Sequence, residues 1–301
     1  MISHRSRFVR SWLFAPADVE RRASKCLNSG AGAGILDLED AVAIVNKASA
    51  RQAALKCLQV PRGSFGYVRI NPIGEGGEDD LMIIVSGGLD GILLPKSEDA
   101  QTLLKADTLL SQLEASRGLP IGTVDLVPII ESCLGLSNVL EIARASPRVS
   151  RLAFGAGDLT RDLGIEWTCD EEELKIARFQ IAVASRASGL AAPVDTVFAN
   201  LADKEGLRQS VMRGMRMGFG SKTCIHPDQL ASVHSGYAPT DAQVTEAQRM
   251  VDAFSAAENA GIAAIRLDGK LVDYAIAKRA ADLIDLAKMH SEADKLQGSR
   301  Q

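Results

Sequence analysis

The sequence predicts an α/β protein built on a (β/α)8 barrel, or TIM barrel, with a C-terminal helical extension. Eight short apolar runs alternate with longer segments of helical periodicity. The runs are mostly apolar, which is typical of buried parallel strands. Eight such repeats occupy about 230 residues, a usual length for this barrel. A doubly wound sheet is the alternative fold, but no GxGxxG turn follows the first run.

The predicted strands follow one another along the chain. They are 11–17, 34–40, 67–71, 91–96, 125–132, 151–159, 194–199 and 218–227. Between them, segments such as 98–116 and 170–188 show the three-to-four-residue apolar spacing that predicts amphipathic helices. The glycines of "GAGAG" precede the second strand, so we interpret them as a tight helix-to-strand turn and not as a phosphate-binding loop.

The chain continues well past the eighth predicted strand. We therefore expect a barrel over residues 1–235 and an extension over 236–301 that could pack on a neighbouring subunit. Within the extension, residues 240–257 predict a helix with a threonine cap. Asp268–Gly269 then predicts the turn of a short hairpin, and residues 272–295 predict a second helix.

Composition excludes several classes of protein. The net charge is −4 with a sequence pI near 5.7, so no basic field points to nucleic acid or an anionic membrane. No apolar stretch approaches the roughly 18 residues of a membrane span. The five cysteines are widely spaced and form no CxxC motif, so we expect reduced thiols in a cytoplasmic protein.

Candidate functional residues lie at the predicted carboxyl ends of the strands, where TIM barrels place their active sites. They are Asp37, Glu39, Asp40, Arg69, Asn71, Lys96, Glu131, Ser132, Asp158, Lys222 and His226. Glu131 and Asp158 form the best pair for Mg²⁺, because they follow adjacent strands. Mg²⁺ usually takes one or two protein carboxylates and leaves its other positions to water and substrate.

A substrate carboxylate has two predicted partners. The segment Gly155–Ala156–Gly157 would let backbone N–H groups approach it closely. Arg69 would offer a planar guanidinium. Together these residues suggest a Mg²⁺-chelated keto acid held by an arginine.

Each assignment has a structural alternative. Glu131 could be an acid at a helix N-terminus, Asp158 a helix cap, and Arg69 an ion-pair partner within the barrel. Lys96 could form a Schiff base, although such a lysine more often neutralises nearby acids. His226 could be a catalytic base or a structural residue beside Pro227.

Eight motifs, in order along residues 10–276, resemble one family. They are "RSWLFAPAD", "ILDLEDAV", "VRIN", "LLPK", "PIIES", "FGAGDLTRDLG", "GFGSKTCIHPDQL" and "LDGKLVDYA". In them the chain resembles the citrate lyase β-subunit-like branch of the HpcH/HpaI aldolase/citrate lyase superfamily. The motifs are specific to the family and much less specific to one substrate.

The resemblance implies a site and an assembly. It implies a barrel that forms homotrimers or homohexamers. It also implies that Glu131 and Asp158 bind Mg²⁺ and that Arg69 binds the carboxylate of the keto acid product. Related malyl-CoA-type lyases use an aspartate from the C-terminal segment of a neighbouring subunit, here Asp273. They bind the CoA phosphates with basic residues after the first strand, and the resemblance implies this role for Arg22 and Lys25.

The implied reaction is retro-Claisen cleavage of a 3-hydroxyacyl-CoA, with Asp273 as the acid or base at carbon. We favour citryl-CoA, giving acetyl-CoA and oxaloacetate, with malyl-CoA and citramalyl-CoA as close alternatives. Glu39 and Asp40 are expected to hold metal-bound waters or to orient Arg69 and Lys96. Two alternative functions remain open. The protein could be a Mg²⁺-dependent aldolase that acts on free hydroxy-keto acids, or a β subunit that is inactive without citrate lyase partner subunits.

Overall fold

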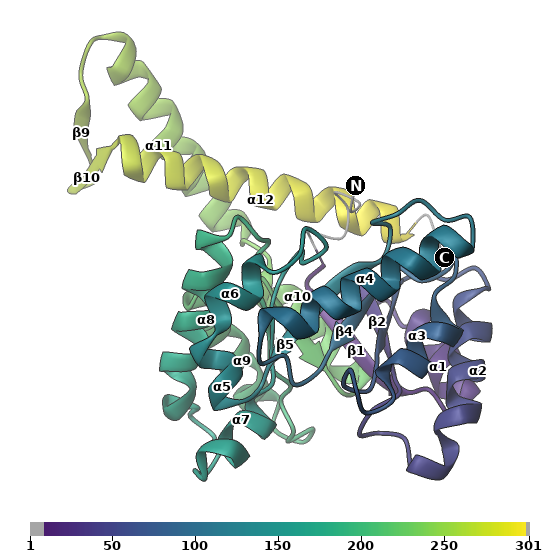
Figure 1. The fold of residues 1–301 in the computed structure, drawn as a ribbon. Coiled ribbons are helices and arrows are strands. Elements are labelled where there is room, and N and C mark those ends of the chain that lie inside the picture. Colours follow the sequence, from purple (N-terminus) through teal and green to yellow (C-terminus); the bar gives the residue numbers. More distant parts are fainter. Residues whose placement is uncertain (1–8, 299–301) are drawn as a thin grey trace. The chain divides into compact units, whose positions relative to one another are not determined.

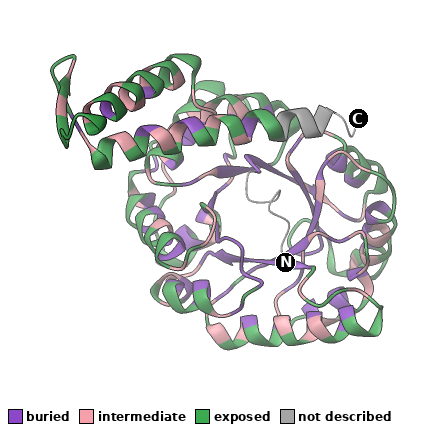
Figure 2. Cartoon of the chain, turned by 90° about the horizontal axis from the view of Figure 1, so that it is seen from above, coloured by how far each residue is buried: buried purple, intermediate pink, exposed green. Residues whose placement is uncertain are grey.

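The computed structural model describes residues 9–298, with side chains as far as residue 292. The chain divides into two compact units, and the boundary falls between Tyr237 and Ala238. The first unit contains a closed barrel in which eight parallel strands follow one another in sequence order (Figure 1). The predicted (β/α)8 barrel is therefore confirmed. Seen from above, a ring of buried strands is surrounded by helices with exposed outer faces (Figure 2).

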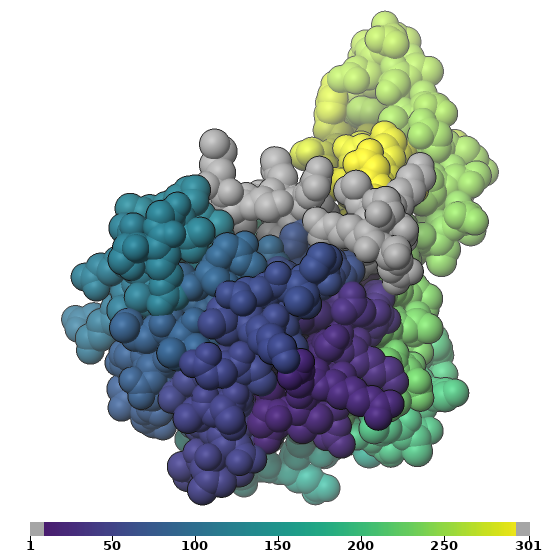
Figure 3. Space-filling model, turned by 90° about the vertical axis from the view of Figure 1, so that its right-hand side faces the viewer, coloured from purple at the N-terminus to yellow at the C-terminus, as the bar shows by residue number. Residues whose placement is uncertain are grey.

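Each strand of the barrel lies within or close to a predicted apolar run. The strands are β1 (Ser11–Pro16), β2 (Ala33–Asp37), β3 (Phe65–Arg69), β4 (Gly91–Leu94), β5 (Asp125–Ile130), β6 (Ala153–Phe154), β7 (Val194–Asp195) and β8 (Ser221–Cys224). The ring closes where β1 pairs with β8, with Ser11 opposite Lys222. On the surface, this closure brings the start of the barrel (purple) next to its last segments (green) (Figure 3).

Helices connect the strands and cover the outside of the barrel. They are α1 (Glu20–Leu27), α2 (Lys47–Leu58), α3 (Gly77–Ile84), α4 (Ala100–Ser116), α5 (Cys133–Ser137), α6 (Val139–Arg144), α7 (Ala156–Leu163), α8 (Lys175–Ala187), α9 (Lys204–Arg216) and α10 (Leu230–Tyr237), with single 3-10 turns η2 (Ile44–Asn46), η3 (Glu172–Leu174) and η4 (Pro227–Gln229). Side-chain caps start several of them. Asp99 accepts from the Thr102 N–H at the start of α4, for example.

The predicted sixth strand, 151–159, is too long. Only Ala153 and Phe154 pair with neighbouring strands, and α7 already begins at Ala156. Gly155 stands between them and donates its N–H to the Ile130 carbonyl at 3.0 Å. Asp158 therefore lies in the first turn of a helix and not at the end of a strand.

Apolar side chains fill both sides of the sheet, because successive residues of a strand point to opposite faces. On β2, Ile35 belongs to the cluster inside the barrel and Leu36 to the layer beneath the helices. Inside, the Trp12 and Tyr67 rings pack edge to face with centroids 4.7 Å apart. The Tyr67 hydroxyl donates to Asp125 at 2.9 Å. The barrel is a packed core that holds the strand ends in fixed positions.

The second unit is a helical hairpin with a short β-hairpin between its helices. It contains α11 (Asp241–Asn259), β9 (Ala264–Leu267), β10 (Lys270–Asp273) and α12 (Tyr274–Gly298). Thr240 caps α11, as predicted. Asp268 and Gly269 both have positive φ, which the predicted two-residue turn requires. Within residues 9–298, no helix combines the length and apolar character needed to cross a bilayer.

Candidate active site

Charged side chains from five consecutive strand–helix connections meet at the carboxyl end of the barrel, called here the barrel mouth. They are Asp37 and Glu39 at and after β2, Arg69 at the end of β3, Lys96 after β4, Glu131 after β5 and Asp158 in α7. All but Lys96 and Asp158 are buried or nearly so. Such a concentration of buried charge is expensive unless the charges are paired or bind a ligand.

Arg69 is held in place by two acids. Its Nε donates to Asp37 Oδ1 at 2.7 Å, and its Nη2 donates to Asp37 Oδ2 at 2.5 Å. Its Nη1 lies 3.0 Å from Glu39 Oε2. Asp37 also accepts the backbone N–H groups of Glu39 and Ala41, so it is itself fixed. Asp37 is therefore a fixed ion-pair partner of Arg69. A guanidinium has five N–H donors, so donors on Nη1 and Nη2 remain available for a substrate carboxylate.

Glu131 is 5% exposed and is positioned by its neighbours. Its Oε1 accepts the Lys96 backbone N–H at 2.7 Å. Lys96 has a φ of +47°, a strained conformation for a residue with a side chain, and it is one of three such residues in the described chain. Ser132, not Glu131, caps α5. The alternative in which Glu131 serves as a helix N-terminal acid is therefore not supported.

Gly155 makes room for Glu131. A Cβ at this position would lie 2.5 Å from Glu131 Oε2 and 2.6 Å from its Cβ, far closer than van der Waals contact. The N–H groups of Gly155 and Ala156 already donate to the Ile130 carbonyl and to the Thr196 hydroxyl. Gly157 lies in the first turn of α7, where N–H groups have no acceptor within the helix. Among the three predicted residues, its N–H is therefore the best placed to meet a ligand.

Burial and mutual repulsion change the protonation of the acids. Burial, together with repulsion from nearby Glu39 and Asp158, raises the pKa of Glu131 to about 8, although the Lys96 N–H and Arg69 oppose this. Burial likewise raises the pKa of Glu39 to about 7, although Arg69 opposes this. A cation placed among these carboxylates would relieve the same repulsion.

Lys96 does not have the environment of a Schiff-base lysine. Partial burial alone would lower the pKa of its amine, but Glu39, whose Oε1 lies 3.4 Å away, outweighs this and the pKa is raised. A lysine that forms a Schiff base needs a depressed pKa. Neutralisation of the acids is the role that the geometry favours.

The donor set fits Mg²⁺. In the side chains that the structure describes, no three His, Cys, Asp or Glu residues gather into a metal cage. Mg²⁺ needs no such cage, because one or two carboxylates suffice when water and substrate complete its shell. Glu131 and Asp158 supply two carboxylates close enough for their charges to interact. Asp158 meets Arg161 through Oδ1 at 2.8 Å and is partly exposed at the barrel mouth.

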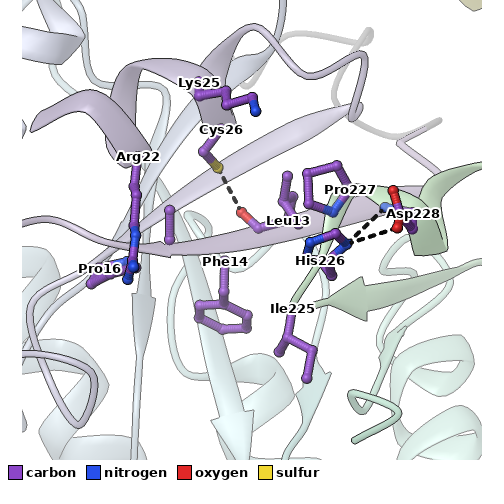
Figure 4. A pocket seen from close by; sticks show the side chains of 11 residues that line it. Leu13, Phe14, Pro16, Arg22, Lys25, Cys26, Ile225, His226, Pro227 and Asp228 are labelled. Atoms are coloured by element: carbon purple, nitrogen blue, oxygen red, sulfur yellow. Dashed lines mark hydrogen bonds and ion pairs between the residues drawn. The ribbon is translucent and has the colours of Figure 1, made fainter. Parts of the chain in front are cut away.

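A pocket of about 500 Å³ lies beside β1 and the segment after β8 (Figure 4). Its lining residues are Leu13, Phe14, Ala15, Pro16, Arg22, Lys25, Cys26, Ile225, His226, Pro227 and Asp228. Arg22 and Lys25, the predicted phosphate-binding residues, come from α1 on one wall. Phe14 joins the pocket to the acid cluster, because its ring lies 5.1 Å from the Arg69 guanidinium carbon.

Other predicted residues have different surroundings. His226 caps η4 by accepting the Asp228 N–H, which gives it a structural role at the pocket wall. Asp40 is exposed beyond Glu39. Asp273 belongs to the second unit, where its Oδ1 accepts the Ile276 N–H at the start of α12. Asp273 is therefore not part of the barrel unit that carries Glu131.

Lys222 is not at the barrel mouth. It is fully buried behind the sheet and forms an ion pair with Asp195 at 3.1 Å. Asp195 also binds Arg178 at 2.9 Å, and Arg178 binds Glu171 at 2.8 Å. We call Glu171, Arg178, Asp195 and Lys222 the buried ion network. Sequence reasoning missed it, although a lysine within a strand predicted to be buried was a signal that a buried acid must accompany it.

The fold and the barrel mouth define a class: TIM-barrel proteins that gather carboxylates and an arginine at the end of the barrel where active sites of this fold lie. Residues 10–227 match the family described as HpcH/HpaI aldolase/citrate lyase. The chain belongs to this family, whose members are carbon–carbon lyases.

Three relatives illustrate the likeness. The citrate lyase subunit beta of Leuconostoc mesenteroides is 36% identical, and the alignment covers 96% of each chain. A (3S)-malyl-CoA thioesterase of Cereibacter sphaeroides is 34% identical over 90% of this chain and 92% of its own. The crystal structure of CitE from Mycobacterium tuberculosis with magnesium, acetoacetate and coenzyme A superposes with a TM-score of 0.77. It is 28% identical, over 94% of this chain and 99% of that chain.

Proposed function

We propose that this protein is a Mg²⁺-dependent lyase that cleaves a 3-hydroxyacyl-CoA bearing a carboxylate, with citryl-CoA as the favoured substrate. One observation supports this most directly. The carboxylates of Glu131 and Asp158 lie at the same barrel mouth as Arg69, and Phe14 links that mouth to a pocket containing Arg22 and Lys25. The relatives include a citrate lyase subunit and a structure holding magnesium, a keto acid and coenzyme A.

Each residue has a separate task in this proposal. Glu131 and Asp158 would hold Mg²⁺, which when bound supplies Lewis-acid stabilisation of negative charge on oxygen. Arg69 binds the carboxylate of the fragment that becomes the keto acid and so aligns the breaking bond. Glu39 forms ion pairs with both Arg69 and Lys96, so its negative charge offsets part of their positive charge.

The bond that breaks joins the hydroxyl-bearing carbon to the carbon next to the thioester. The hydroxyl gives its proton to solvent water as this bond breaks, and its carbon becomes the carbonyl carbon of the keto acid. The electron pair of the broken bond leaves with the acyl-CoA fragment as its enolate. Asp273 then donates a proton to the enolate carbon, and removes it in the synthetic direction. We propose that Asp273 reaches the barrel mouth of a neighbouring subunit through the extension.

Replacing Arg22 and Lys25 with alanine tests the phosphate-binding role. Each lost charge-assisted hydrogen bond is worth about 1.5–3 kcal/mol, so the double variant should raise the KM for CoA thioesters by roughly 10-fold or more, with little change in kcat. Arg21→Ala is the matched control, because Arg21 lies on the same helix outside the pocket. An unchanged KM would favour the alternative of an aldolase that acts on free hydroxy-keto acids.

Replacing Asp273 with asparagine tests the acid/base role. Asparagine caps a helix as well as aspartate does, so the start of α12 should be preserved. Loss of a general acid typically slows turnover by about 10²–10⁴-fold, and we expect kcat to fall in this range. Mg²⁺ affinity, measured by titration calorimetry, should stay the same. Normal turnover would remove Asp273 from the mechanism.

A substrate screen distinguishes the remaining candidates. Citryl-CoA, malyl-CoA and citramalyl-CoA are each incubated with the protein, with Mg²⁺ added or withheld, and both the keto acid and free CoA are measured. Cleavage releases a keto acid and an acyl-CoA, whereas the thioesterase activity named for one relative would release free CoA and the intact hydroxy acid, with no keto acid. Activity that appears only with an added acyl carrier subunit would indicate a β subunit of a citrate lyase complex.

A further inference from the structure

The outer face of α8 exposes an unusual row of large apolar side chains. Ile176, Phe179 and Val183 are 74%, 61% and 51% exposed. The opposite face of the same helix is buried against the barrel through residues such as Ile181 and Ala184. Helix α8 is therefore apolar on both sides, which is typical of a helix that has a partner on its outer face.

The row has the spacing of a helix–helix seam. Glu172, Ile176, Phe179, Val183 and Arg186 follow one another at intervals of four, three, four and three residues. This alternation places side chains along one stripe of a helix, as in a coiled coil. The 3-10 turn η3 leads directly into α8 and contributes Glu172. The row is acidic at its start, apolar over its three central positions and basic at its end.

We propose that α8 pairs with α8 of a second copy of this chain, antiparallel across a two-fold axis near Phe179. In that arrangement Phe179 packs on its own counterpart and Ile176 packs on Val183 of the other copy. Glu172 at one end then meets Arg186 at the opposite end of the other helix. A two-fold interface must be complementary to itself, and this order of acid, apolar and basic residues satisfies that requirement.

The neighbouring surface suits the same contact. Helix α6 packs beside α8 on the outside of the barrel (Figure 1) and exposes Leu140 (41%). Glu172 is exposed and forms an ion pair with Lys175 within its own chain. It can also reach a partner's cation, because one carboxylate accepts several hydrogen bonds. Charged ends around an apolar centre are the usual composition of a specific interface.

The mass of the full-length protein in sedimentation velocity tests the pairing. Phe179→Glu would bring two like charges together on the axis, so the mass of the particle should fall by a factor of two relative to wild type. This factor is the same for a dimer and for a hexamer built from two trimers. Melting by circular dichroism checks that the variant is folded. A folded variant with the wild-type mass would overturn the proposal.

A charge swap provides a second test. Arg186→Glu and Glu172→Arg should each weaken association, because each variant faces a like charge twice across the axis. The two changes together should restore the wild-type mass. Failure of the double variant to associate better than either single variant would contradict the antiparallel register.

Cross-linking locates the axis. Phe179→Cys, placed in a Cys169→Ser background to remove an exposed native thiol, should form a disulfide-linked dimer on mild oxidation. Ile176→Cys is the control, because its own counterpart lies away from the axis. The proposal would be contradicted if both variants cross-linked equally, or if Phe179→Cys formed no disulfide-linked dimer.

Discussion

Glu131→Gln should reduce Mg²⁺-dependent cleavage by more than about 100-fold. Loss of residues that only orient metal ligands typically costs 10–100-fold in affinity or activity, and Glu131 is proposed to bind the metal itself. Glutamine keeps the shape, and its amide oxygen can still accept the Lys96 N–H. The negative charge at the barrel mouth is what the substitution removes. Kinetics at increasing Mg²⁺ and titration calorimetry should show weaker metal binding together with lower turnover.

The matched control is Glu141→Gln, a change of the same chemistry on the exposed surface of α6. It should leave both metal affinity and turnover unchanged. Full activity of Glu131→Gln with citryl-, malyl- and citramalyl-CoA would place the metal elsewhere. Glu39 would then be the next candidate ligand, because its two oxygens are buried and form ion pairs but no aligned hydrogen bond.

Asp195→Asn should lower the free energy of unfolding by about 3–5 kcal/mol, the usual cost of removing one partner from a buried ion pair. Asp195 and Lys222 are both completely buried, and Arg178 is nearly so. Asparagine fits the space but leaves Lys222 without an anionic partner among the ion pairs of the described chain. Denaturant unfolding monitored by circular dichroism measures the change. Asp228→Asn, on an exposed side chain, should change stability by less than about 0.5 kcal/mol.

The same network predicts a pH dependence. Burial alone would raise the pKa of Asp195, but the cations of Lys222 and Arg178 outweigh it and lower the pKa below its ordinary value. A carboxylate with a lowered pKa in the folded state stabilises the protein fully above its unfolded pKa, about 3.9. It loses that contribution as the pH falls through the folded value. The stability difference between wild type and Asp195→Asn should therefore be largest near neutral pH and shrink in acid. A constant difference down to pH 2 would contradict this assignment.

The fold could be predicted from sequence because strands of a parallel barrel are buried on both faces and appear as short apolar runs. The barrel mouth was partly predictable for a related reason. In this fold, polar residues such as Glu131 that directly follow an apolar run lie where catalytic groups gather. Arg69 could be named in the same way, since it ends the third strand.

The remaining features depend on contacts between distant segments. The role of Gly155 is to leave space for Glu131, and nothing near Gly155 in the sequence indicates this. Lys222 was expected at the barrel mouth, but it lies in the buried ion network. Its partner Asp195 lies on β7, which has only two residues. A strand this short shows no alternation of apolar and polar residues, so its sequence does not indicate which way the Asp195 side chain points.

The position of Arg69 in the sheet bears on how the proposed substrate would be bound. Asp37 and Arg69 lie directly opposite each other in the pairing of β2 with β3, so backbone hydrogen bonds and their ion pair act together. The guanidinium is thus preorganised and has little rotamer entropy left to lose, a saving of about 0.5–1.5 kcal/mol for one side chain. A keto acid has few atoms with which to offset such ordering costs. Because Arg69 is ordered before the substrate arrives, it can orient the keto acid part even if that part binds weakly. Most of the affinity can then come from the rest of the substrate.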